Sequence, residues 1–371
     1  MQHNLIIRDG AIIAYRLFGV AHEIDLKQVE GLWASEAGAA RRGWLNATPP
    51  KAMAFGVPPV ALPLGPVTLE LEGGSVAAEV TARVYDFGTI SFALRVPIKE
   101  MNWPLFVAQF GEVDHAIGHA SGTAIWANLL RQVCGLLAQA LIRPVQSPLE
   151  EDYLIGLVHG FNEELEAAAL LANVDLAALL SGERRPLSEV TRQDLMRQRF
   201  SYYTDDLVLL TWARAFIYEP RGDTDVIDVL EVANARLLET RYFDELLDAE
   251  LPRMYDLIND VRRTNVLVAP RRFSTLARRL YTLVAEVTEF SEKLDNALQA
   301  TGDVYLARIY AGALDLFRVH AISAAVDRKL AILRDTYSAL HDEASSARGE
   351  LLEILVVVLI AMEIVLPFLH K

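Results

Sequence analysis

The C-terminal part of the sequence contains a long apolar run, Leu351–Leu369, which reads LLEILVVVLIAMEIVLPFL. Only Glu353, Glu363 and Pro367 interrupt it. As an α-helix the run would be roughly 28 Å long, close to the ~30 Å hydrocarbon core of a bilayer. We therefore predict a C-terminal transmembrane helix over 351–369, with the rest of the chain on one side of the membrane.

The two carboxylates in this run favour a different interpretation. An ionised carboxylate near the middle of a bilayer costs roughly 3 kcal/mol. Glu353 falls in the first turn, where the interface and the helix N-terminus tolerate a negative charge. Glu363 would have to be protonated, paired across an oligomer, or outside lipid. The alternative is that 351–369 is a buried helix of a helical bundle.

Upstream of the apolar run, apolar or small residues recur at alternating spacings of four and three. This heptad pattern continues for about five repeats and predicts one helix face packed against a partner helix. We expect a homo-oligomer to assemble through this face. Its positions are Val319, Ser323, Val326, Leu330, Leu333, Tyr337, Leu340, Ala344, Ala347, Leu351 and Ile354.

The order of patterns along the chain predicts an α+β fold. Alternating apolar residues and turn signals predict strands at 11–18, 67–71, 76–84, 89–96, 152–158 and 206–218, with helices at 25–33, 104–116, 124–141, 162–180 and 189–199. From Asp223 onward the pattern is helical, with Pro252 expected to kink or divide the first long helix. We predict an α+β head over 1–221, a long antiparallel helical, coiled-coil-like stalk over 222–350, and the transmembrane helix.

Composition limits the compartment and the partners. The hydrophobic fraction of 52% and mean hydropathy of +0.22 fit a membrane segment plus buried helices. The net charge of −14 argues against direct sequence-specific nucleic-acid binding by the whole protein. The start of the sequence has neither the basic region nor the long apolar region of a signal peptide. The bulk of the chain is therefore expected in the cytoplasm.

Sequence motifs for familiar chemistry are missing. The chain has no glycine-rich dinucleotide or P-loop motif, no G-x-S-x-G and no H-E-x-x-H. The single cysteine, Cys134, excludes an internal disulfide and is interpreted as a small core residue on a helix. We predict no catalytic residues and no cofactor.

The best metal-like spacing is His115-x-x-x-His119, because two histidines four apart share one helix face. Glu112 and Asp114 stand beside this pair. A third ligand would have to come from elsewhere in the chain. A metal-dependent enzyme using these histidines and a carboxylate is therefore an alternative function, although exposed or satisfied histidines are the more common outcome.

Arginine pairs suggest a third class of function. They occur at 184–185, 262–263, 271–272 and 278–279, partly around the tip that would join two stalk helices. A phosphate of a lipid headgroup or of RNA could bind there, although solvated loop charges are the usual case. A ribosome- or RNA-associated factor at the membrane is the corresponding alternative.

Two stretches resemble the "required for meiotic nuclear division" and Sad1-interacting factor proteins. One is Val84-Tyr85-Asp86-Phe87-Gly88-Thr89-Ile90-Ser91-Phe92, similar to a strand–turn–strand signature of that family. The other is Leu352-Glu353 followed by an apolar run with a second acid, Glu363; between them lies Leu238-Glu239-x-Arg241. The resemblance implies an α+β head, a helical stalk and a C-terminal membrane helix without established catalytic residues. It also implies a translation-related partner and, without a transit peptide, the inner membrane of a bacterium.

Together these patterns predict a non-enzymatic, membrane-anchored interaction or scaffold protein. The lipid membrane, further copies of the chain and an unknown protein are its expected partners. The residues expected to contact membrane or oligomer are Glu353, Glu363, Leu330, Leu333, Tyr337 and Leu340.

Overall fold

The structure is a computed structural model of the chain. It describes residues 5–36, 41–42, 57–118, 123–183, 185–262 and 303–369, with eight helical positions between 275 and 288; over 340–369 the side chains are described only in part. The chain forms two compact units. The first comprises 1–239 with 294–320, and the second comprises 240–293 with 321–371.

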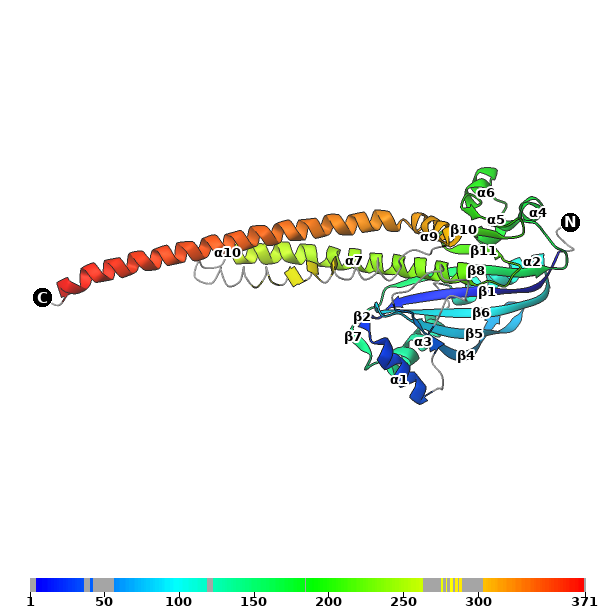
Figure 1. The fold of residues 1–371 in the computed structure, drawn as a ribbon, viewed down its shortest axis with the longest axis horizontal. Coiled ribbons are helices and arrows are strands. Elements are labelled where there is room, and N and C mark those ends of the chain that lie inside the picture. The colour runs from blue at the N-terminus through cyan, green and yellow to red at the C-terminus, as the bar shows by residue number, and fades with distance from the viewer. Residues whose placement is uncertain are drawn as a thin grey trace. The chain divides into compact units, whose positions relative to one another are not determined.

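Strands occupy the first part of the chain and long helices the second (Figure 1). The strands are β1 Ile6–Gly19, β2 Ala21–Ile24, β3 Arg41–Arg42, β4 Val60–Leu71, β5 Gly74–Val84, β6 Thr89–Asn102, β7 Leu141–Pro144, β8 Glu150–Phe161, β9 Arg199–Phe200, β10 Leu207–Leu210 and β11 Arg214–Tyr218. The helices are α1 Leu26–Glu36, α2 Trp103–Ile117, α3 Thr123–Leu136, α4 Ala167–Asn173, α5 Leu176–Ser181, α6 Glu189–Leu195, α7 Asp225–Arg262, α9 Val304–Leu316 and α10 Val319–Leu369. The predicted α+β class is confirmed.

A large mixed sheet is the frame of the first unit. Its nine described strands run in the order β3-β4-β5-β6-β1-β8-β11-β10-β9, and all neighbours are antiparallel except β8 and β11. The central strand β1 pairs with β6 from Ile6 to Gly19. Because both faces of β1 are covered, its residues from Gly10 to Phe18 are all buried. A central strand of this kind is nearly continuously apolar rather than alternating.

One face of the sheet packs against α2. Phe106 and Phe110 of this helix are buried with Ile12 and Ala14 of β1 in one apolar cluster. The helix begins where the side chain of Asn102 accepts a hydrogen bond from the Leu105 amide, with Pro104 in the first turn. The sequence therefore places an aromatic stripe of α2 against the sheet.

The turn between β5 and β6 depends on a glycine. Gly88 has a φ of 88°, and a Cβ there would meet the backbone oxygen of Ala21. The Gly88 carbonyl accepts hydrogen bonds from the amides of Val20 and Ala21. Only glycine combines this left-handed backbone with so close an approach. The strands predicted at 76–84 and 89–96 are confirmed as parts of β5 and β6, and this turn joins them.

The opposite face of the sheet carries a second buried layer that includes the N-terminal half of α7. Ile13, Tyr15 and Leu17 of β1 lie on this face, since they alternate with the residues that meet α2. From Asp225 to Thr240 every α7 residue but one is buried. A helix that is covered on nearly all sides must also bury the polar side chains that it carries.

The second unit is built from long helices. The Nζ atom of Lys329 on α10 lies 2.7 Å from Asp244 Oδ1 and 2.6 Å from Asp248 Oδ1, both on the second half of α7. Tyr337 packs on Tyr281, with ring centroids 5.9 Å apart. These contacts place α7 and α10 side by side and bring the 275–288 helical positions against α10.

Several sequence-predicted elements differ from the structure. The segment 206–218 is a hairpin rather than one strand, because Thr211–Ala213 forms a tight turn. Helix 162–180 is divided into α4 and α5, and α7 continues through Pro252. β4 begins at Val60, before the strand predicted at 67–71, and Pro63 and Pro66 are tolerated there beside a bulge.

No single helix among the described residues is both long enough and apolar enough to cross a membrane. One pair meets those requirements jointly: Val304–Leu316 with Val319–Ala339, bent by 63°.

Candidate functional site

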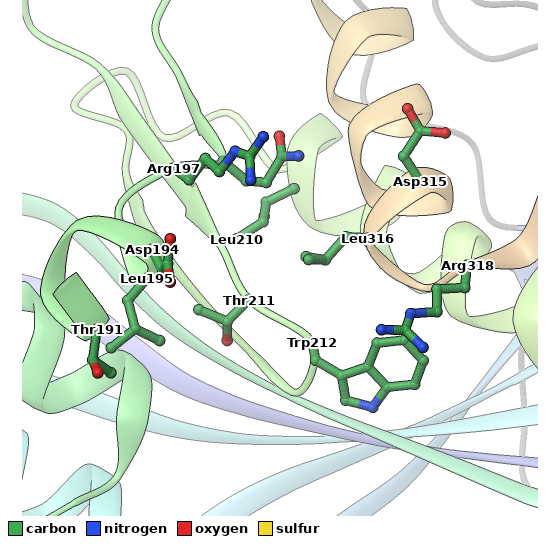
Figure 2. A pocket seen from close by; sticks show the side chains of 11 residues that line it. Thr191, Asp194, Leu195, Arg197, Leu210, Thr211, Trp212, Asp315, Leu316 and Arg318 are labelled. Carbon is green, nitrogen blue, oxygen red and sulfur yellow. The ribbon is translucent and has the colours of Figure 1, made fainter.

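A pocket of about 630 Å³ opens on the first unit (Figure 2). Three segments line it: α6 with the turn that follows, the β10–β11 hairpin, and the junction of α9 with α10. Its lining residues are Thr191, Asp194, Leu195, Arg197, Gln198, Leu210, Thr211, Trp212, Asp315, Leu316 and Arg318. The pocket combines leucines and one indole with two guanidinium groups and two carboxylates, a mixture found in small-molecule sites.

The indole of Trp212 is exposed but firmly positioned. The residue is 52% exposed at the tip of the β10–β11 hairpin. Tyr153 fixes that tip, because its hydroxyl lies 3.0 Å from the carbonyl oxygen of Thr211 and 3.1 Å from that of Arg214. Phe317 and the indole pack at nearly a right angle, with ring centroids 6.1 Å apart. Trp212 therefore offers a ring face to solvent on a rigid support.

The two arginines that line the pocket form no internal ion pairs among the described residues. Neither Arg197 nor Arg318 forms a side-chain hydrogen bond or ion pair with another residue in the described part of the chain. Asp315 instead approaches His320, at 3.5 Å, and Figure 2 shows its carboxylate directed away from Trp212. The Arg318 and Trp212 side chains both line the pocket (Figure 2). The guanidinium groups remain available to an external anion.

A second polar group, buried rather than open, lies between the sheet and α7. Arg83 Nη1 on β5 is 2.5 Å from Asp228 Oδ1 and 2.5 Å from Glu231 Oε2. Both acids are almost completely buried. One guanidinium thus binds two carboxylates that α7 brings to the sheet three residues apart, on one helix face. We call Arg83, Asp228 and Glu231 the buried ion cluster.

Burial controls the protonation of this cluster and its neighbours. Burial raises the pKa of Asp228 to about 6, although Arg83 lowers it. Burial alone would lower the pKa of Arg83, but Glu231 and Asp228 together raise it well above its ordinary value. The pKa of Tyr15 is raised first by burial and then by Glu231. Arg83 is therefore charged at any physiological pH, and Tyr15 keeps its proton.

Another buried acid, Glu239, lies two helical turns further along α7 and is not part of the buried ion cluster. It is 4% exposed, and neither carboxylate oxygen has a hydrogen-bond partner among the described residues. Burial raises the pKa of its carboxyl well above the ordinary value, Arg236 offsets part of this effect, and Asp86 adds to it. Glu239 therefore folds as a neutral acid.

The histidine pair suggested by the sequence is described only in part. His119 lies outside the described residues, and His115 is exposed near the end of α2. Asp114 forms an ion pair with Arg214. Within the described ranges, no three histidine, cysteine, aspartate or glutamate side chains are close enough to hold a metal ion. The burial of Cys134 raises its pKa to about 11, as expected for a structural thiol.

The residues predicted to contact membrane or oligomer fall into two groups. Leu330 and Leu333 are buried in the single chain, and Tyr337 packs on Tyr281. Glu353 is exposed on α10, whereas the side chains of Leu340 and Glu363 lie outside the described residues. Homo-oligomer formation through the heptad face stays a prediction.

Sequence reasoning missed both polar sites described here. Nothing in the spacing of Arg83 and Asp228 indicates that they meet, because 145 residues separate them. One signal was available in the sequence: the segment Asp225–Glu239 carries four acids among mostly apolar residues. Acids that interrupt an apolar helix indicate buried charge or a buried neutral acid.

Comparison with known proteins identifies the family. A family model described as "Uncharacterized protein MJ0711, N-terminal domain" matches residues 9–224. A protein of Methanocaldococcus jannaschii with the description "Uncharacterized protein MJ0711" is 26% identical over 192 residues. This alignment covers 52% of the chain and 58% of that relative's length. No solved structure matches the chain.

The resemblance to the meiotic nuclear division and Sad1-interacting factor proteins was wrong. The strand–turn–strand stretch 84–92 that suggested it lies inside the region matched by a different family model. A short turn flanked by strands occurs in many folds, so it identifies a local conformation and not a family. The chain belongs to the family described as the N-terminal domain of the uncharacterized protein MJ0711.

Proposed function

We propose that the protein is a membrane-anchored, non-enzymatic interaction protein whose anchor is the α10 segment 351–369. The observation that carries the proposal is a band of exposed apolar side chains on α10. Leu355 to Ile360, with Met362, are each between 50% and 61% exposed. Consecutive residues of a helix point in all directions, so this band surrounds the helix.

A band of apolar side chains around a helix is expected to be shielded from water by lipid or by protein. Surface helices of globular proteins bury one apolar stripe and leave a polar face in water, and helices that are apolar on all sides are buried or span membranes. The helical length of the segment matches the thickness of a bilayer, and Glu353 falls in its first turn, where a charge is tolerated. A bilayer covers all sides of the band at once, which one packed helix cannot do.

Deleting the segment should release the protein from membranes. We expect the full-length chain to stay in the membrane pellet after washing with high salt and then alkaline carbonate, and a chain ending at Glu350 to appear in the supernatant. Val358→Arg should weaken retention, since an arginine near the middle of a span costs roughly 3 kcal/mol. Fractionation followed by immunoblotting measures all three.

The matched control is Val304→Arg on α9, at a valine that is 75% exposed. This substitution adds the same charge at an exposed valine outside the band, so retention should not change. Equal release of the full-length and truncated chains by carbonate would contradict the anchor. In that case 351–369 would be covered by protein, and Glu363 would require a protein partner.

A further inference from the structure

We propose that the pocket on the first unit binds a planar aromatic ligand carrying an anionic group, with nucleoside phosphates as the chemical class. This inference goes beyond the membrane anchor and does not depend on it. A volume of about 630 Å³ is within the range of small-molecule sites and accommodates a nucleotide. The site has two parts, an exposed ring and free guanidinium groups, and the ligand must match both.

The ring part is Trp212. An exposed indole at a hairpin tip would ordinarily be mobile, yet Tyr153 and Thr211 fix the tip through hydrogen bonds, and Phe317 supports the ring from the side. A base stacked on an aromatic side chain contributes roughly 1–3 kcal/mol. Leu210 and Leu316 extend the apolar surface of the pocket beside the indole. A planar heterocycle fits this surface better than an aliphatic chain, because its whole face contacts the ring.

The anion part is Arg318, with Arg197 on the same pocket. Guanidinium groups bind phosphate through paired hydrogen bonds, and these two have no carboxylate partner within the described residues. No glycine lines the pocket among the described residues, so phosphate would meet side chains rather than a cradle of backbone amides. A site of this kind carries no glycine-rich phosphate-loop motif in its sequence. Asp194 also lines the pocket and can accept a hydrogen bond from an amino group of a base.

The backbone of Arg318 supports a role for its side chain. The residue has a φ of 55°, just after the C-terminus of α9, a position where glycine is the least strained choice. Non-glycine residues held in this region are strained and cluster at functional sites. An arginine there carries a backbone penalty that a glycine would relieve.

Binding of AMP, adenosine and inorganic phosphate to the full-length protein, measured by calorimetry, tests the proposal. AMP should bind, and adenosine and phosphate should each bind at least tenfold more weakly. Trp212→Ala and Arg318→Gly should each weaken AMP binding tenfold or more, and Trp212→Phe should weaken it less. Arg318→Gly should also leave the melting temperature unchanged or raise it, a result that separates loss of binding from loss of folding.

The controls are Arg131→Gln on α3 and Tyr255→Ala on α7, which remove an exposed cation and an exposed ring outside the pocket. Neither should affect AMP binding. The proposal fails if AMP does not bind at millimolar concentration, or if it binds equally well to the pocket variants. Adenosine binding as tightly as AMP would refute the anion part, and phosphate binding as tightly would refute the ring part.

Discussion

Replacing Arg83 with methionine should destabilise the protein by about 3–5 kcal/mol at neutral pH, the cost of leaving buried charges unpaired. Asp228 and Glu231 would lose the guanidinium that lies 2.5 Å from each of them. Burial prevents water from replacing it. Guanidinium chloride unfolding of the purified protein at pH 7.5 measures the loss.

The stability lost in the Arg83→Met variant, relative to the parent, should become smaller as the pH falls towards 5. Arg83 lowers the pKa of Asp228, so without it that pKa rises further in the folded state, and the folded variant binds a proton that the unfolded chain does not. Stability then increases as pH falls through that value. A deficit that is the same at pH 5 and pH 7.5 would contradict the role assigned to the buried ion cluster.

Two further variants separate charge from packing. Arg192→Met is the matched control, because Arg192 forms an ion pair with Asp175 in which both side chains are partly exposed, and its loss should cost far less stability than the loss of Arg83. The triple variant Arg83→Met, Asp228→Leu, Glu231→Met removes all three charges with similar volumes. It should recover most of the stability lost by Arg83→Met, since buried ion clusters are often replaceable by apolar groups.

Replacing Glu239 with glutamine should stabilise the protein at neutral pH, because burial raises the pKa of the Glu239 carboxyl well above its ordinary value. The parent must keep a buried carboxyl protonated above its ordinary pKa, which costs about 1.4 kcal/mol for each pH unit. Because the folded pKa is raised, the parent loses stability as pH rises from about 4.5 towards that folded value. Glutamine has a similar shape and no proton to lose.

The stability difference between Glu239→Gln and the parent should therefore grow between pH 5 and pH 7.5 and vanish near pH 4.5. Denaturant unfolding at a series of pH values measures it. Glu245→Gln on the same helix is the control, since Glu245 is largely exposed and its carboxylate lies 4.0 Å from the guanidinium of Arg241. A difference that does not change with pH would show that Glu239 is ionised in the folded protein.

The long-range pairing explains why the polar sites could not be predicted. Arg83 lies on a strand that reads as an ordinary alternating segment, and Asp228 and Glu231 read as charges on one helix. Only the packing of α7 on the sheet brings them within ion-pair distance. The pocket could not be predicted for the same reason. Trp212 lies at a hairpin tip and Arg318 at a helix junction, and more than a hundred residues separate them in the sequence.

The sequence by itself determined the features that depend on neighbours along the chain. Asp25 caps α1, Gly88 permits the β5–β6 turn, and the apolar periods of 3.6 and 2 separate helices from strands. The tertiary structure decided the strand order, the hairpin at 207–218 and the division of the final helix at Arg318. The physical reason is that local steric and capping preferences act within a few residues, whereas burial and ion pairing depend on which distant segments meet, and many pairings satisfy the same local pattern.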